Sequence, residues 1–168
     1  MDMDKRLRMT PERDRTTFGR SHAVRHPECD YAGEIDVHLT LCAAVGKPFA
    51  NAPLAQFVCG SVETASKLLS FSLYGLCLMP DHLHVLISPA QSGKSVGDWL
   101  RQFKGYTSHE YRSFGGTPPL WQRSAYDHVC REGETAEKVL TYIVNNPVRA
   151  GLVKGWQDWP WTTVLIDL

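Results

Sequence analysis

Hydrophobic and polar residues alternate over residues 34–42, which places Ile35, Val37, Leu39 and Leu41 on one side of the chain. Alternation of this length predicts a half-buried β-strand. Residues 70–78 and 82–88 are also strand-like, and the Met-Pro-Asp sequence at 79–81 supplies turn residues between them. The pattern therefore predicts a strand followed by a β-hairpin, and a further strand over residues 124–130.

Three other segments repeat their apolar residues every three or four positions, which predicts helices over about residues 51–69, 95–112 and 133–146. The first begins with Asn51 as N-cap and Pro53 in the first turn, and the third ends before Pro147. The resulting order, βαββαβα, is a ferredoxin-like βαββαβ arrangement with an additional C-terminal helix that carries Tyr142. We therefore expect an α+β fold in which two helices cover one face of a four-stranded antiparallel sheet and the extra helix reaches the other face.

The length of 168 residues and a hydrophobic content of 43% are typical of one globular domain, which we place at residues 28–168. Residues 1–27 differ from the rest, because Met1 to Arg25 contain seven Lys or Arg against four Asp or Glu and few apolar positions. This composition predicts a loose basic N-terminal arm.

Charge and cysteine usage narrow the class of protein. A formal net charge of zero disfavours a protein that coats duplex DNA by bulk electrostatic attraction. The five cysteines are widely spaced without a C-x-x-C pair, which is typical of reduced thiols. No apolar stretch approaches the roughly 20 residues of a membrane span, and the N-terminus lacks a signal peptide's apolar region. We expect a cytoplasmic protein with no membrane association.

The histidines His82 and His84 flank Leu83 in the predicted strand 82–88. Strand side chains alternate, so both imidazoles leave one face while Leu83 leaves the other. Two imidazoles on a rigid strand can form half of a divalent metal site. Two ligands are too few for a complete site, so the pair by itself fits a hydrogen-bonding role equally well.

Tyr142 and Asn146 share a polar stripe with Lys138 on the last predicted helix, away from its apolar face. Asn146 can supply an oxygen ligand to a divalent ion, and Tyr142 can act as a nucleophile. Phenols ionise only near a pH of about 10, so attack on a phosphodiester needs a cation or a base nearby. Each residue singly also fits a structural role, as an edge aromatic and as a helix-terminal amide.

Four motifs occur in order along the chain: Met-Pro-Asp-His-Leu-His at 79–84, Leu-Trp-Gln-Arg at 120–123, the segment 142–153 from Tyr142 to Val153, and Asp-Trp-Pro-Trp at 158–161. Together they resemble the REP-associated tyrosine transposases, a branch of the HUH single-strand DNA endonucleases. The resemblance covers roughly residues 30–163. It implies a bacterial-type, nucleoid-associated enzyme that nicks and rejoins single-stranded DNA beside a hairpin through a 5′-phosphotyrosine.

Carried over to this sequence, the resemblance implies that Tyr142 is the nucleophile. It implies that His82, His84 and Asn146 bind a divalent ion, Mg²⁺ or Mn²⁺. The partner would be single-stranded DNA with a hairpin, and the protein would act as a monomer or as a homodimer that exchanges its tyrosine helix.

Several basic and aromatic residues are candidates for contact with DNA, because phosphates attract cations and single strands stack on aromatic rings. They are Arg101, Lys104 and Arg112 on the second predicted helix, Arg123 and Arg149 within two of the motifs, and the rings of Trp121 and Tyr126. The alternatives are a solvated helix face for the cations and a core position for Trp121. Near the C-terminus, Trp156, Trp159 and Trp161 are expected to pack the tail onto the domain.

Two other functions remain open at this point. One is a non-catalytic binder of DNA hairpins, which the intact set of His82, His84, Tyr142 and Asn146 disfavours. The other is a metal-dependent phosphodiesterase that uses activated water and leaves no covalent adduct.

Overall fold

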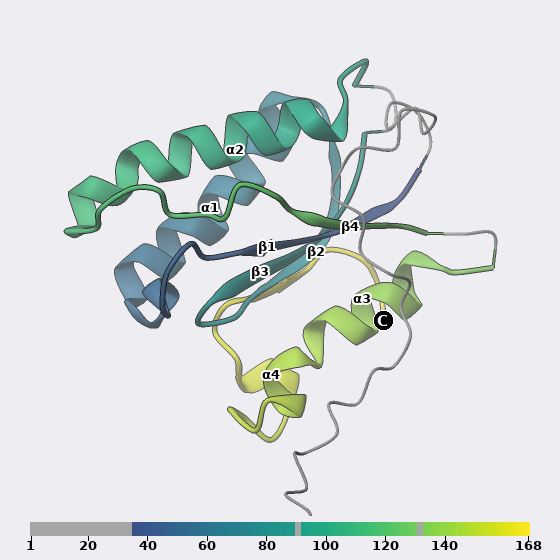
Figure 1. Ribbon diagram of the computed structural model, residues 1–168. Coiled ribbons are helices and arrows are strands. Elements are labelled where there is room, and N and C mark those ends of the chain that lie inside the picture. Colours follow the sequence, from purple (N-terminus) through teal and green to yellow (C-terminus); the bar gives the residue numbers. More distant parts are fainter. Residues whose placement is uncertain (1–34, 90–91, 131–132) are drawn as a thin grey trace, which may run out of the picture.

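The computed structural model describes residues 35–89, 92–130 and 133–168 (Figure 1), so the predicted basic arm at 1–27 lies outside the described residues. The strands are β1 (Val37–Cys42), β2 (Ser72–Leu78), β3 (His82–Ser88), β4 (Tyr126–Val129) and β5 (Thr162–Val164). The α-helices are α1 (Ala52–Leu68), α2 (Val96–Glu110), α3 (Ala136–Val144) and α4 (Asn146–Arg149). Short 3₁₀ helices occupy Pro48–Ala50, Tyr111–Phe114 and Trp156–Asp158.

The five strands form one antiparallel sheet in the order β4-β1-β3-β2-β5. The first four strands follow the ferredoxin-like order, so the predicted fold class is confirmed. The fifth strand was not predicted, because three residues are too short to show a periodic pattern. It pairs with β2, and nearby the indole nitrogen of Trp159 donates to the Leu78 carbonyl at 2.9 Å. The C-terminal tail therefore extends the sheet as well as packing against it.

Helices α1 and α2 cover one face of the sheet, and α3 with α4 lies on the other (Figure 1). Under α1 and α2 the alternating aliphatic residues of β1 and β3 are fully buried with Trp99 and Phe103. Asn51 caps α1 by accepting from the Leu54 amide at 3.0 Å, as predicted. Burial of each large side chain contributes roughly 1.5–3 kcal/mol, so this layer supplies most of the hydrophobic stabilisation.

Helix α3 packs on the second face of the sheet, over β2 and β3. Its apolar stripe meets a smaller buried cluster formed by Cys77, Met79, Leu86, Val139, Leu140, Ile143 and Val144. The helix ends at Val144, earlier than the predicted boundary at residue 146, and the one-turn α4 begins at Asn146. Pro147 has no amide hydrogen to donate to the Ile143 carbonyl, which explains the break. The expectation that Tyr142 and Asn146 share one continuous helix is therefore wrong.

None of the helices within the described ranges is long and apolar enough to cross a membrane. The four cysteines in these ranges, Cys42, Cys59, Cys77 and Cys130, all carry free thiols. Cys29 lies outside the described residues.

Gly75 allows β5 and α3 to approach β2 closely. A Cβ atom at this position would lie 2.6 Å from the Thr163 carbonyl oxygen and 2.7 Å from Cδ1 of Leu140. We expect Gly75→Ala to lower the free energy of unfolding by about 1–3 kcal/mol, because a strand backbone and a packed helix must both shift. Urea denaturation followed by tryptophan fluorescence measures this change.

Gly60→Ala is the matched control, because Gly60 lies within α1 and a Cβ atom there meets nothing within 4 Å. We expect it to be neutral or stabilising, since alanine favours the helix by roughly 0.5–1 kcal/mol over glycine. Equal stability of Gly75→Ala and the unmodified chain would contradict the described packing of α3 and β5.

Candidate active site

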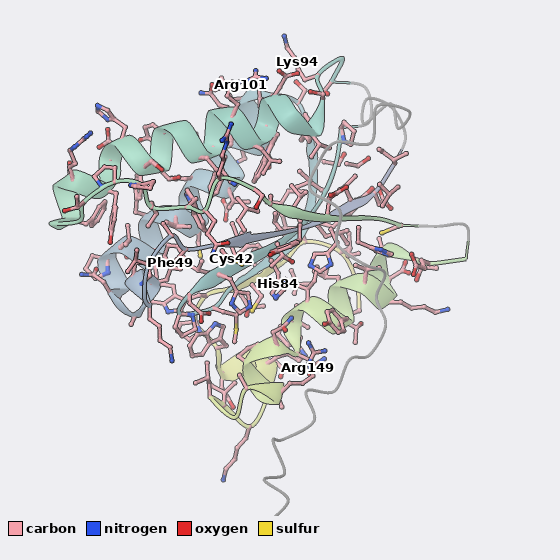
Figure 2. The ribbon with its side chains drawn as sticks, viewed as in Figure 1. Cys42, Phe49, His84, Lys94, Arg101 and Arg149 are labelled. Carbon is pink, nitrogen blue, oxygen red and sulfur yellow. The ribbon has the colours of Figure 1, made fainter. Side chains whose placement is uncertain are left out.

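The histidines of β3 lie on the sheet face that α3 covers. Leu83, Val85 and Ile87 are fully buried in the core under α1 and α2, so the alternation of the strand directs His82 and His84 to the opposite face. Figure 2 shows His84 on the side of the sheet that faces α3 and α4, from which Arg149 extends. The sequence prediction that both imidazoles share one face is thus met.

The two imidazoles converge on a common point, because Nε2 of His82 lies 3.1 Å from Nε2 of His84. Two nitrogen ligands at about 2.0–2.1 Å from one ion, at tetrahedral or octahedral angles, are separated by roughly 2.8–3.4 Å. Nδ1 of His82 lies 2.6 Å from Oδ1 of Asp81, and a carboxylate only accepts hydrogen bonds. In the neutral ring Nδ1 therefore carries the proton, and Nε2 of His82 directs a lone pair toward His84, as in histidines that bind metals. The pair fits a divalent ion.

A third histidine, His38 on β1, completes the cluster and was missed by the sequence analysis. Its Nε2 lies 3.0 Å from Nδ1 of His84, and Thr40 Oγ1 lies 3.0 Å from the same nitrogen. In the antiparallel pairing of β1 with β3, Thr40 stands directly opposite His84. The alternation in residues 34–42 does place His38 and Thr40 on the polar face, but only the strand pairing connects them to His84.

The surroundings of the cluster favour neutral imidazoles. His84 is buried, and the pKa of its imidazole is lowered well below 6.5, first by burial and then by the charges of His38, His82 and Arg149. Removal from water lowers the pKa of His38 to about 4, with His128 as a secondary cause. Both rings are therefore neutral at neutral pH, and each neutral ring has one N–H group and one lone pair.

Tyr142 on α3 borders this cluster. Its ring makes an edge-on contact with His38, with ring centroids 6.4 Å apart, and Cζ of Arg149 lies 4.0 Å from the Tyr142 ring centroid. A guanidinium over a ring face is a favourable cation–π arrangement. The structure thus brings the tyrosine and a cation from the last helical segment together with the histidines.

Asn146 lies beside Tyr142, but its side chain is turned to the end of α3. Its Nδ2 donates to the carbonyls of Ile143 at 2.8 Å and Tyr142 at 3.3 Å, and its Oδ1 accepts from Nη2 of Arg149 at 2.8 Å. Within the described ranges no three His, Cys, Asp or Glu side chains are grouped to hold a metal ion. A metal ion bound by the two histidines would therefore need an oxygen ligand other than a carboxylate. The amide oxygen of Asn146 is such a ligand, and in this structure it accepts from the guanidinium of Arg149.

The structure divides the residues predicted to contact DNA into those that are buried or bonded within the fold and those that lie at the surface. Trp121 is 3% exposed and donates to Thr107 Oγ1 at 2.8 Å, so the prediction of a stacking platform there is wrong and its core alternative holds. The Lys104 ammonium donates to the Gln122 and Ser124 carbonyls at 3.0 and 3.1 Å. It therefore ties the 122–124 loop to α2.

The remaining candidates lie at the surface. Arg101 pairs with Asp98 at 2.9 Å on α2, which belongs to the layer opposite the histidines. Arg112, Arg123 and Tyr126 are exposed. Among the predicted cations, Arg149 is the one that the structure places against Tyr142.

The chain is similar in sequence to known transposases. The family model for IS200-like transposases matches residues 32–146. A REP-associated tyrosine transposase assigned in Haemophilus influenzae is 27% identical over 108 residues, and one of Escherichia coli is 26% identical over 98 residues. Each match covers 58% of this chain, and the chain spans 61% and 57% of the lengths of these relatives.

Two solved structures share the fold. One, of a REP-associated tyrosine transposase bound to a REP hairpin, superposes with a TM-score of 0.67 at 21% identity, covering 86% of this chain and 82% of the other. The second, a transposase assigned in Deinococcus radiodurans, has a TM-score of 0.52 at 20% identity and covers 70% of this chain and 94% of the other. At these identities the similarity establishes the architecture.

Proposed function

The chain belongs to the IS200-like transposase family, and from this premise we propose that it nicks and rejoins single-stranded DNA beside hairpins through a covalent bond to Tyr142. The observation that carries the proposal is the position of Tyr142, in edge contact with His38 and under the guanidinium of Arg149. A tyrosine, an arginine and a histidine cluster therefore lie at one site, a grouping that supports the proposal. A solved structure with the same fold, a REP-associated tyrosine transposase bound to a REP hairpin, supports hairpin DNA as the substrate class.

In the proposed nicking step, the Tyr142 oxygen attacks the scissile phosphorus and forms a P–O bond. The bond from phosphorus to the 3′-oxygen breaks, the phenol proton passes to a base, and the 3′-oxygen takes up a proton as it leaves. The products are a 5′-phosphotyrosine and a free 3′-hydroxyl. The phosphoester bond is retained in the adduct, so attack by another 3′-hydroxyl rejoins DNA without a nucleotide cofactor. Such a protein would act on nucleoid DNA in a bacterial-type cytoplasm.

We further propose that His82, His84 and Asn146 hold a divalent cation, Mg²⁺ or Mn²⁺. When bound, the ion supplies Lewis-acid polarisation of the scissile phosphate and neutralises its charge. Asp81 orients the His82 ring so that its Nε2 faces that of His84. Arg149 now binds the Asn146 oxygen, and its guanidinium is suited to hold a phosphate oxygen beside Tyr142 once the two side chains separate.

The test uses the full chain and a pool of imperfect-hairpin oligonucleotides with randomised single-stranded flanks, labelled at either the 3′ or the 5′ end. With Mn²⁺ or Mg²⁺, the 3′ label should appear in an SDS-resistant adduct and the 5′ label in a free fragment. EDTA should suppress both products. Tryptic mass spectrometry should locate the nucleotide on Tyr142.

Three outcomes would contradict the proposal. A 5′ label on the protein would reverse the polarity of the reaction. Cleavage without an adduct would indicate a phosphodiesterase that uses activated water, and binding without cleavage would indicate a non-catalytic hairpin binder.

A further inference from the structure

Both ring nitrogens of His84 have partners, and the partners of Nε2 and of Nδ1 are chemically different. Nε2 faces Nε2 of His82 at 3.1 Å, at the proposed cation position. Nδ1 faces Nε2 of His38 and Oγ1 of Thr40, each at 3.0 Å. Since His84 is buried, it exchanges these partners for water only at a cost. The neighbouring groups therefore determine which ring nitrogen of His84 carries its proton.

The positions of the ring protons on His82 and His84 determine which atom donates in each of these contacts. His82 presents a lone pair at Nε2, because its Nδ1 proton points to Asp81. If His84 is to share a cation with His82, its Nε2 must also present a lone pair, so its single proton must sit on Nδ1. That Nδ1–H group then needs an acceptor. If the proton sat on Nε2 instead, it would point at His82 and occupy the cation position.

The two groups at Nδ1 differ in how they influence this choice. The Thr40 hydroxyl rotates and can donate or accept, so it satisfies either tautomer of His84. A neutral imidazole cannot rotate its proton in this way. When the Nε2 of His38 presents its lone pair, it accepts from His84 and disfavours the tautomer that blocks the cation position.

We propose that His38 is a positioning residue, which accepts the Nδ1–H of His84 and so directs the Nε2 lone pair of His84 toward a divalent cation shared with His82. The inference rests on the proposed function, because that function uses the cation. It adds a residue on β1 that contacts His84 and that no motif of the chain contains. The same ring borders Tyr142, so β1 connects the cation position with the tyrosine helix.

The test measures Mn²⁺ binding to the full chain without DNA, by electron paramagnetic resonance of the free ion. We expect His38→Phe, which keeps a ring but removes both nitrogens, to weaken Mn²⁺ binding by about 10–100-fold, as second-layer partners of metal-binding histidines do. His38→Gln, whose amide oxygen can accept from His84, should recover most of the affinity. His109→Phe, on the exposed surface of α2, is the matched control and should bind as the unmodified chain does.

A second measurement separates positioning from packing. Long-range ¹H–¹⁵N spectra of the Zn²⁺-loaded protein report which nitrogen of His84 carries the proton. We expect Nδ1–H in the unmodified chain and in His38→Gln. If His38→Phe does not fold, His38→Asn, with an amide too short to reach His84, takes its place with the same expected weakening.

Mn²⁺ affinity within twofold of the unmodified chain in a folded His38→Phe, or equal weakening in His38→Phe and His38→Gln, would overturn the proposal. An unmodified chain that binds no Mn²⁺ but forms the DNA adduct would also overturn it, and the tyrosine reaction would stand. A chain whose Mn²⁺ affinity depends on His38 but that forms no adduct would refute the proposed function and support this inference.

Discussion

Tyr142→Phe is expected to abolish the covalent protein–DNA adduct. The substitution removes one oxygen atom and keeps the ring that contacts His38 and Arg149, so the site should remain assembled. Loss of an enzymatic nucleophile lowers the rate by a factor of about 10³ or more. We expect the 3′-labelled oligonucleotide to leave no SDS-resistant band, while a gel-shift assay shows hairpin binding within about threefold of the unmodified chain.

Tyr106→Phe is the matched control for this experiment. Tyr106 is exposed on α2, a helix of the layer on the other side of the sheet from the histidine cluster. It should form the adduct at the rate of the unmodified chain. An adduct that persists in Tyr142→Phe would show that another residue is the nucleophile.

His82→Ala is expected to have the second-largest effect, a loss of about 10²–10³-fold in the metal-dependent rate of adduct formation. Replacing His82 should perturb the fold less than replacing His84, because the His82 side chain is 27% exposed whereas His84 is buried among polar partners. The substitution removes one of the two converging Nε2 atoms and leaves His84 and Tyr142 in place. Rates measured over a series of Mn²⁺ concentrations should show a weaker dependence on the ion as well as a lower maximum.

The control here is His109→Ala, whose exposed ring pairs with Glu110 on the surface of α2. It should retain the full rate at every Mn²⁺ concentration. If His82→Ala also retained it, the proposed cation position between His82 and His84 would be wrong, although Tyr142 could still be the nucleophile.

The accuracy of the predicted elements follows the length of their patterns. The strand at residues 82–88 was predicted to the residue, and Asn51 and Pro53 located the start of α1 correctly. These signals are local, since side-chain alternation and capping depend on neighbours within one turn or one strand. The end of α3 and the strand β5 were missed because each is decided by a few residues and their contacts with the rest of the fold.

Burial was the least predictable property of the candidate DNA contacts. Trp121 and Tyr126 were both candidates for stacking on bases. Trp121 lies in the core, where no base can reach it, whereas Tyr126 is exposed. Lys104 looked like a free cation, yet its ammonium is bonded to two carbonyls of a loop about 20 residues away. An aromatic ring or a long cationic side chain suits either role, so composition alone does not distinguish them.

The sequence by itself determined the ferredoxin-like order, the shared face of His82 and His84, and Tyr142 as the candidate nucleophile, because periodicity and ordered motifs are properties of neighbouring residues. Only the tertiary structure decided that His38 and Thr40 contact Nδ1 of His84, that the Asn146 side chain bonds to the Ile143 carbonyl and to Arg149, and that Trp121 is buried. His38 and His84 are 46 positions apart and meet through the pairing of β1 with β3. That pairing depends on the whole sheet closing over its core, which no local pattern specifies.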